Sequence, residues 1–488
     1  MGNKILLIST SFEKNPVMCK EKPNDTSPEY GKSYTEKESY PIGLAYLYSY
    51  LKSKGYIPKI LHLNYYYENE CHEEILETIE KESPDVVAFQ MLTSNRTSTC
   101  KAIENVHLRF PKIKIILGGI HATLLYRNLI KRYPFVFIVL GEGEETLIEL
   151  LNEFPKKKPN YKKIKGLFYY EKGKAIMNPT RPLIENLDSL PFPAHEQFIT
   201  KNVTKACLLT SRGCPFKCSF CCINPLTQRK VRFRSVQNVL EEIEEVIKGF
   251  PWLKEIWLFD DTFFLDNKRV IEICKGIIKM KTKIQFTCCG RIKPISMEMI
   301  PYLEKANFKS ILLGVESGSK EVLAKTGKGI TPKEVEEAFN KFKHSKITLK
   351  PFHIIGLPGE NKRTAIESAR FFRKLQKIKY DYVGNLANYL KVYPGTKVYE
   401  IVKEKGAIDD IYWDGTESCP FFLLENTRKE LYEYGEIYLN HVCLDRIITL
   451  KGFSKQWMMI PYIIPRIIKR IYMNPLLIKN IFRRILKK

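Results

Sequence analysis

Three closely spaced cysteines are the residues best suited to chemistry in this chain of 488 amino acids. Cys214, Cys218 and Cys221 have C-x3-C-x2-C spacing and follow a predicted strand. Each thiolate can bind one iron of a cubane 4Fe-4S cluster, which leaves the fourth iron without a protein ligand. The amino and carboxylate groups of S-adenosylmethionine (SAM) could chelate that iron. One electron would then break the S–C bond and release a 5′-deoxyadenosyl radical.

Two other interpretations of these cysteines are a zinc site and ordinary reduced thiols. Zinc prefers four ligands, usually in separated pairs, and Cys222 lies too close to Cys221 to complete a tetrahedron easily. The spacing therefore favours the cluster, and Cys222 is interpreted as a packed thiol. We find neither a signal peptide nor an apolar span long enough to cross a membrane, so the 13 cysteines are expected in a cytoplasmic, reducing environment.

The elements that would position the cysteine loop form a series of alternating strands and helices at 203–405. Apolar runs predict strands at 205–210, 255–259, 284–288, 310–314, 348–355 and 383–392. Between them lie helical patterns such as 235–248, where apolar residues fall on one face. We expect a partial or full parallel barrel, with its active site at the carboxyl ends of the strands.

The cysteine loop and its place after the first barrel strand resemble the radical SAM superfamily, and Phe220 just before the third cysteine fits its pattern. The resemblance implies a partial (β/α)6 barrel with Phe220 near the adenine of SAM. It also implies further SAM contacts at the ends of strands two to five: Asp260 and Asp261 with the methionine amino group, Arg291 with the carboxylate, Glu316 with the ribose, and Gly356 beside the adenine. Taken alone, an acidic pair after a strand is more often a helix cap, and Gly-Leu-Pro-Gly is more often only a turn. Their order behind the cysteine loop favours the functional interpretation.

Residues 1–154 show a second strand and helix rhythm. Strands are predicted at 4–9, 58–63, 85–90, 114–117 and 135–140, with a helix at 42–54 that stops at Gly55. This pattern is typical of a doubly wound, Rossmann-like domain whose ligand lies at the carboxyl ends of the strands.

Several loops of this domain resemble the cobalamin-binding domain that often precedes a radical SAM barrel. The candidate cobalamin residues are Leu92, Thr93, Gly118, Gly119, His121, Gly141 and Glu142. The sequence departs from the family in one respect, because no D-x-H-x-x-G motif follows the first strand to supply a histidine ligand for cobalt. His121 is interpreted as a hydrogen-bonding loop residue rather than a metal ligand. A domain that keeps the fold without the cofactor, or serves as a docking platform, is the alternative.

The remaining segments are a linker at 155–202, with a small hairpin expected around residues 172–173, and a helical region at 406–488. From Arg446 onward the chain has eleven Lys or Arg and no Asp or Glu, interleaved with apolar residues. Such a basic amphipathic tail can bind anionic lipid at a membrane surface, or it can pack on the protein while its charges are solvated. The formal net charge of +25 also fits nucleic acid, but no recognition motif accompanies it.

We therefore predict an α/β protein that combines a Rossmann-like cobalamin-binding-type domain, a partial (β/α)6 radical SAM barrel and a helical C-terminal tail. The predicted activity is reductive cleavage of SAM to modify an unactivated carbon of a small-molecule or lipid-like substrate, by cobalamin-dependent methylation or cyclisation, with a low-potential electron donor. The alternatives are a radical SAM enzyme without cobalamin, and a non-catalytic iron-sulfur or zinc protein that senses or scaffolds.

Overall fold

The computed structural model describes residues 4–13, 40–293, 295–379, 387–415, 417 and 419–442. The chain divides into two compact units, which are described separately. The first contains Met1–Cys289, Pro301–Phe308 and Lys391–Pro420, and the second contains Gly290–Ile300, Lys309–Leu390 and Phe421–Lys488.

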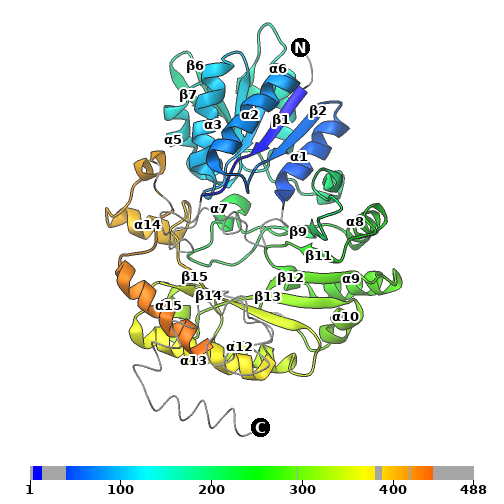
Figure 1. Ribbon diagram of the computed structural model, residues 1–488, viewed down its shortest axis with the longest axis vertical. Coiled ribbons are helices and arrows are strands. Elements are labelled where there is room, and N and C mark those ends of the chain that lie inside the picture. The colour runs from blue at the N-terminus through cyan, green and yellow to red at the C-terminus, as the bar shows by residue number, and fades with distance from the viewer. Residues whose placement is uncertain are drawn as a thin grey trace. The chain divides into compact units, whose positions relative to one another are not determined.

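The first sheet begins with five parallel strands in the spatial order β2-β1-β3-β4-β5, of which β1 and β2 are labelled in Figure 1. They are β1 (Lys4–Ser9), β2 (Ile57–His62), β3 (Val86–Gln90), β4 (Lys114–Gly118) and β5 (Val136–Val139). Each lies within one residue of its predicted position at both ends. The strand order reverses between β1 and β3, which is the topological switch point where open α/β sheets bind ligands. The predicted Rossmann-like fold is confirmed.

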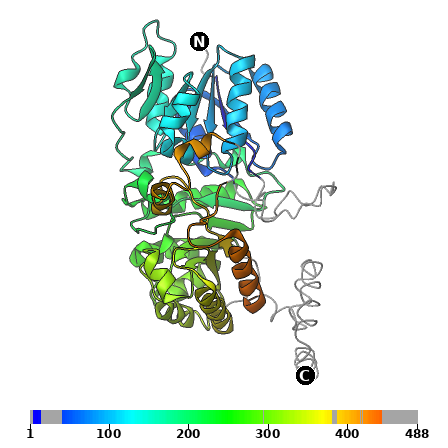
Figure 2. The ribbon, with the colours of Figure 1, turned by 90° about the vertical axis from the view of Figure 1, so that its left-hand side faces the viewer.

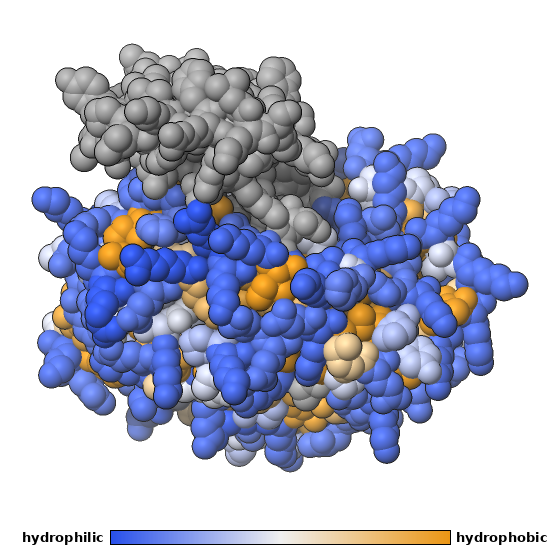
Figure 3. All heavy atoms as spheres, turned by 90° about the horizontal axis from the view of Figure 1, so that it is seen from below, coloured by the Kyte–Doolittle hydropathy of each residue, from blue (hydrophilic) through white to orange (hydrophobic). Residues whose placement is uncertain are grey.

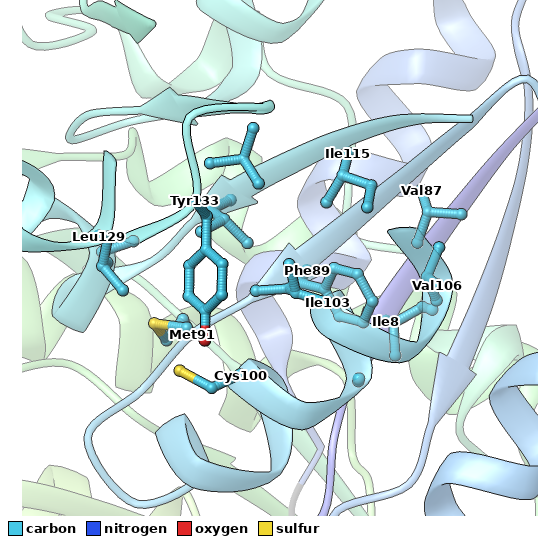
Figure 4. Close-up of a cluster of buried hydrophobic side chains, with 14 of the residues drawn as sticks. Ile8, Val87, Phe89, Met91, Cys100, Ile103, Val106, Ile115, Leu129 and Tyr133 are labelled. Carbon is cyan, nitrogen blue, oxygen red and sulfur yellow. The ribbon is translucent and has the colours of Figure 1, made fainter. Parts of the chain in front are cut away.

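Helices cover both faces of this sheet, as Figure 2 shows. One face packs against α1 (Ile42–Ser53) and α6 (Glu144–Glu153). The other packs against α2 (Glu68–Glu82), α3 (Arg96–Arg109) and α5 (Tyr126–Arg132). On that second face Phe89, Ile103 and Ile115 are buried at the centre of a continuous apolar cluster (Figure 4). Strands buried on both faces account for the uninterrupted apolar runs in the sequence.

The first sheet continues into the segment that was expected to be a linker. A hairpin of β6 (Leu167–Glu171) and β7 (Lys174–Met177) turns at the expected position. Strand β6 pairs antiparallel with β5, so the complete sheet has seven strands. Leu167 and Phe168 are buried against the first domain. The hairpin is therefore part of this sheet rather than a free connection.

The strands of the second series in the first unit are β8 (Lys205–Leu208), β11 (Glu255–Leu258) and most of β12 (Gln285–Arg291), which are parallel in the order β8-β11-β12. Helices α8 (Val236–Gly249) and α9 (Asn267–Lys279) are strongly amphipathic, and each buries its apolar face. The unit also contains a short ribbon of β9 (Ser211–Arg212) and β10 (Arg232–Phe233) with α7 (Ile223–Thr227) between the two strands, and later α14 (Lys397–Glu404).

The second unit contains most of β13 (Phe308–Glu316) and all of β14 (Thr348–Ile355) and β15 (Ala387–Tyr389), which are parallel in the order β13-β14-β15. The predicted last strand, 383–392, lies partly outside the described residues. The remaining helices of the barrel region are α10 (Met299–Lys305), α11 (Lys320–Lys325), α12 (Pro332–Lys341), α13 (Lys362–Lys379) and α15 (Arg428–Val442). The strand and helix alternation confirms the predicted half-barrel.

The basic tail at 446–488 lies outside the described residues. Among the helices that are described, none combines the length and apolarity needed to cross a membrane. The surface seen in Figure 3 is mainly hydrophilic, and its apolar side chains are scattered among hydrophilic ones.

Candidate active site

The cysteine loop, residues 213–231, leaves the barrel through a narrow neck. At the neck, Arg212 of β9 pairs with Arg232 of β10. Gly213 has φ +100°, and a Cβ there would collide with the carbonyl oxygen of Lys230. Only glycine allows the two ends of the loop to approach so closely. The ribbon thus closes a loop that carries all three predicted cluster ligands.

The thiols of this loop are half-buried. Cys214, Cys218, Cys221 and Cys222 are all of intermediate burial, and none forms a disulfide. Burial raises the pKa of Cys221 to about 12, and the neighbouring thiols Cys222, Cys218 and Cys214 contribute to the rise. Within the residues that are described, no set of three His, Cys, Asp or Glu side chains is arranged to hold a metal ion. A cubane requires one thiolate for each of three irons, and iron would displace the thiol protons, so the donor set fits a cluster.

Asp260 and Asp261, at the end of β11, have different surroundings. The Asp260 carboxylate is 2% exposed and accepts hydrogen bonds from the backbone N–H and hydroxyl groups of Thr210 and Ser211. Burial raises its pKa, and these hydrogen bonds oppose the rise. All four donors lie on the chain that enters the cysteine loop, so Asp260 fixes the path of that chain.

Asp261 has an exposed side chain, and one of its oxygens accepts a hydrogen bond from the Gly213 N–H at 3.1 Å. Its surroundings are nevertheless crowded enough that burial raises its pKa. Of the two acids, Asp261 is the one whose carboxylate can meet a ligand.

The middle of the cysteine loop is held by a distant part of the sequence. The Ser219 carbonyl oxygen accepts a hydrogen bond from the N–H of Val398, in the first turn of α14. The next residue, Phe220, is half-buried. The neck therefore holds the two ends of the loop, and this contact holds its middle.

Glu316 and Arg291 both meet the loop after α11, which sequence reasoning did not single out. Glu316 forms a buried ion pair with Lys328, with Oε1 and Nζ 2.6 Å apart and both side chains under 10% exposed. The buried Arg291 guanidinium donates to the Lys328 carbonyl oxygen. Lys328 therefore joins these two predicted SAM residues. No spacing rule indicated it, because the pairing arises only in the folded chain.

The backbone at Glu316 is strained in a way that is uncommon for this residue type. Glu316 has φ +67° and lies at a bulge where β13 shifts register against β14. Its carbonyl oxygen is 2.8 Å from Nδ1 of the buried His353. Burial lowers the pKa of His353 to about 4, so the ring is neutral and its Nδ1–H donates. Backbone conformations of this kind persist when the surroundings enforce them, and they cluster at functional sites.

Gly356 ends β14 with φ +86°. Its N–H donates to the carboxylate of Glu360, a residue that is 3% exposed. Burial raises the pKa of Glu360 to about 7. The Gly-Leu-Pro-Gly segment is thus a turn closed on a buried carboxyl group.

Two of the candidate cobalamin residues at the carboxyl edge of the first sheet form a neutral pair. Thr93 and His121 are buried, with Oγ1 and Nδ1 3.1 Å apart. Burial, together with the charge of Arg96, lowers the pKa of His121 to about 3. The ring of His121 also lies edge-to-face with that of Trp413. Leu92 is held by its N–H, which donates to Asn95.

The glycines of this edge have different physical roles. A Cβ on Gly119, which has φ +97°, would lie 2.8 Å from the Met91 carbonyl oxygen, so the fold itself requires glycine there. At Gly118 the nearest atom would be 3.9 Å away, and at Gly141 no atom lies within 4 Å. Gly118 and Gly141 leave space where a corrin could approach the backbone, so this edge fits cobalamin.

Glu142 is already engaged by the protein. Its two oxygens accept hydrogen bonds from Arg212 at 3.0 Å and Arg232 at 2.8 Å, and from the Ile184 N–H at 2.8 Å. These contacts connect the loop after β5 to the neck of the cysteine loop.

A second buried polar chain was also missed from the sequence. The Tyr40 hydroxyl is 2.6 Å from Nδ1 of His195, and Nε2 of that ring is 2.8 Å from the fully buried Glu242. The other Glu242 oxygen pairs with Arg234, which also donates to the Leu209 carbonyl oxygen. His195 lies in the predicted linker and Glu242 on the apolar face of a helix, where their types gave no signal.

Comparisons with known proteins agree with this organisation. Residues 208–372 match the model of the radical SAM superfamily, and residues 33–151 match that of the B12 binding domain. An uncharacterized methyltransferase of Pyrococcus horikoshii is 30% identical over 382 residues, which cover 76% of this chain and 80% of the relative. The anaerobic magnesium-protoporphyrin IX monomethyl ester cyclase of Cereibacter sphaeroides is 26% identical over 397 residues, which cover 76% of this chain and 61% of that protein.

A solved structure has a similar fold. The radical SAM methyltransferase TsrM from Kitasatospora setae, with tryptophan and a SAM analogue bound, superposes with a TM-score of 0.65 at 17% identity. The match covers 83% of this chain and 77% of that one. At this identity the similarity concerns the fold alone.

Fold and site together define an enzyme in which a cofactor-binding sheet precedes a radical-forming half-barrel. The chain belongs to the radical SAM superfamily, in the group that carries a B12 binding domain. Its cofactors are a 4Fe-4S cluster, SAM and cobalamin, and it acts with a small-molecule substrate and an electron donor.

Proposed function

We propose that Cys214, Cys218 and Cys221 hold the cluster and that the enzyme transfers a methyl group to an unactivated carbon of a small molecule. The observation that carries this proposal is the cysteine loop, which holds three half-buried thiols in one loop on a neck that only Gly213 can close. When bound, the cluster would supply the electron that cleaves SAM, and cobalamin would carry the methyl group.

The chain's own residues would bind and orient SAM. Asp261 offers an exposed carboxylate to the methionine amino group. Glu316 and Arg291 are held in place by Lys328, and we propose them for the ribose and the methionine carboxylate. Phe220 and Gly356 are proposed for the adenine. On the first sheet, Thr93, Gly118, His121 and Gly141 are the proposed cobalamin contacts, with Leu92 and Gly119 shaping the same loops.

The reaction outcome has a second candidate, because a relative of similar coverage is named as a cyclase. Methyl transfer and ring closure differ in what is formed from SAM and substrate, so product mass distinguishes them. A lipid-like substrate and peripheral membrane binding are proposed from the basic composition of 446–488 alone. If that proposal is correct, deleting 446–488 will weaken pelleting with anionic vesicles; unchanged pelleting contradicts it.

The test of the cluster assignment is anaerobic reconstitution with iron and sulfide, followed by an assay for 5′-deoxyadenosine formed from SAM and a low-potential reductant. Cys218→Ala is expected to abolish both the cluster spectrum and the product, because one of the three irons that cysteine would bind loses its protein ligand. Cys222→Ala is the matched control, since its half-buried thiol is not assigned to iron. A Cys218→Ala enzyme with full activity would refute the assignment. Cobalamin retained at about one per chain tests the B12 domain.

A further inference from the structure

One carboxylate accepts hydrogen bonds from both strands of the neck through which the cysteine loop leaves the barrel. Glu142 lies in the turn between β5 and α6, at the carboxyl edge of the first sheet. Its Oε1 accepts from Arg212, on the strand that enters the loop, and its Oε2 accepts from Arg232, on the strand that leaves it. All three side chains are under 20% exposed.

Further contacts hold Glu142, Arg212 and Arg232 in these positions. Arg232 also donates to the Ile184 carbonyl oxygen at 2.7 Å, while the Ile184 N–H returns a hydrogen bond to Glu142. Arg212 also pairs with Glu144 at 2.8 Å, and its guanidinium lies over the Tyr46 ring. Charge-assisted hydrogen bonds in such surroundings are strong and directional. The two guanidinium groups are therefore held at one separation by one carboxylate.

We propose that Glu142 is a positioning residue for the iron-sulfur cluster, acting through Arg212 and Arg232. The inference rests on the proposed function, because it assumes that Cys214, Cys218 and Cys221 bind the cluster. Arg212 is two residues before Cys214 in the chain, so a change in the neck is transmitted directly to the first ligand. Because Glu142 follows Gly141, the same turn that borders the proposed cobalamin edge also sets the path of the cysteine loop.

The geometry excludes a simpler view of Glu142 as a surface acid. Its carboxylate has an arginine on each oxygen, and burial, which alone would raise its pKa, is outweighed by the hydrogen bond from Arg232 and the charge of Arg212. The pKa is lowered, so the group is an anion at neutral pH. Removing the charge would leave Arg212 paired with Glu144, and Arg232 with the neutral Ile184 carbonyl oxygen in place of an anion.

The experiment compares reconstituted Glu142→Gln with wild type. Loss of a charged hydrogen-bond acceptor should speed the release of iron to a chelator about tenfold or more. The midpoint potential of the cluster should also rise, because a negative charge that opposes reduction is removed. Glu145→Gln is the control: it removes an exposed acid of α6, the helix that follows Glu142, paired with Arg181, and both properties should match wild type.

A purely structural role would lower the melting temperature but leave the potential of the remaining cluster unchanged, and that result would overturn the proposal. Unchanged iron release would overturn it as well. If Glu142→Gln does not fold, Arg212→Lys keeps the charge but loses the forked contact to Glu142 and Glu144. Faster amide exchange confined to 213–231 in reconstituted Arg212→Lys supports the proposal, and exchange equal to wild type contradicts it. Failure of the cluster assignment would be visible separately, since the Cys218→Ala protein would then retain its cluster.

Discussion

The proposed ligand contacts of the first sheet and those of the second unit differ in charge. After β3 and β4, the proposed polar contacts are a threonine hydroxyl and a neutral histidine, while the buried Arg96 nearby is already paired with Glu13. After β13, a buried carboxylate pairs with a buried ammonium group. SAM is a small charged molecule that offers few atoms for contact, so charged side chains contribute much of its binding. A corrin is large and can be bound through shape complementarity and hydrogen bonds from uncharged groups. Each edge thus suits the ligand proposed for it, by charge in one case and by open backbone in the other.

Breaking the ion pair between Glu316 and Lys328 should have the largest effect on stability. Glu316→Gln leaves Lys328 buried without its anion, which is expected to destabilise the protein by about 3–5 kcal/mol. In the double variant with Lys328→Met the stability should largely return, because no buried charge remains unpaired. SAM binding, measured by calorimetry on reconstituted protein, should stay impaired in both variants.

The control for this experiment is Glu321→Gln, which alters an exposed acid paired with Arg363 in the same unit. It should change neither stability nor SAM binding appreciably. Recovery of full SAM affinity in the double variant would show that Glu316 has only a structural role.

The same unit also contains a buried carboxyl group, that of Glu360, which binds its proton more tightly than an exposed glutamate does. The folded-state pKa of Glu360 is raised by burial from 4.5 to about 7. An acid with a raised pKa binds its proton more tightly when folded, so stability falls as pH rises from about 4.5 to 7. The lost stability amounts to about 3 kcal/mol above that range.

Glu360→Gln should remove this part of the pH dependence, so its melting temperature relative to wild type should be higher at pH 8 than at pH 5. Glu367→Gln, on an exposed acid of α13, should leave the wild-type profile intact. A parallel shift of the Glu360→Gln profile at both pH values would show that this carboxyl group does not titrate in the expected window.

The carboxyl edge of the first sheet can be tested by substituting two adjacent glycines, Gly118 and Gly119. Gly119→Ala should destabilise the protein by about 1–3 kcal/mol, because the backbone is left-handed and the Cβ would meet Met91. Gly118→Ala has no close neighbour, so its melting temperature should match wild type while it retains less cobalamin. Equal cobalamin retention in Gly118→Ala and wild type would remove this glycine from the proposed cofactor edge.

The sequence predicted most of the fold because buried parallel strands are continuous apolar runs. The hairpin of β6 and β7 was expected, but its pairing with β5 was not, since a hairpin between proline-rich and lysine-rich stretches shows no pattern that distinguishes pairing from isolation. The cysteine loop was recognisable because its residue types and spacing are themselves the chemistry.

The supporting residues of the site could not be predicted in this way. Lys328 and His353 act by contacting Glu316, and those contacts depend on how loops and strands meet in the folded chain. Glu142 was placed with cobalamin on resemblance, but its carboxylate contacts Arg212 and Arg232. Acids and bases far apart in sequence carry no local signal of their partners.

The contact between Ser219 and Val398 has a consequence for synthesis. The two residues are 179 positions apart (398 − 219), so the loop leaves the ribosome about 10–40 s before the helix that secures it, at typical rates of synthesis. During that interval the thiols are tethered only at the neck. A nascent chain would thus present its cysteines openly to an iron-sulfur donor, and arrival of α14 would then fasten the loop.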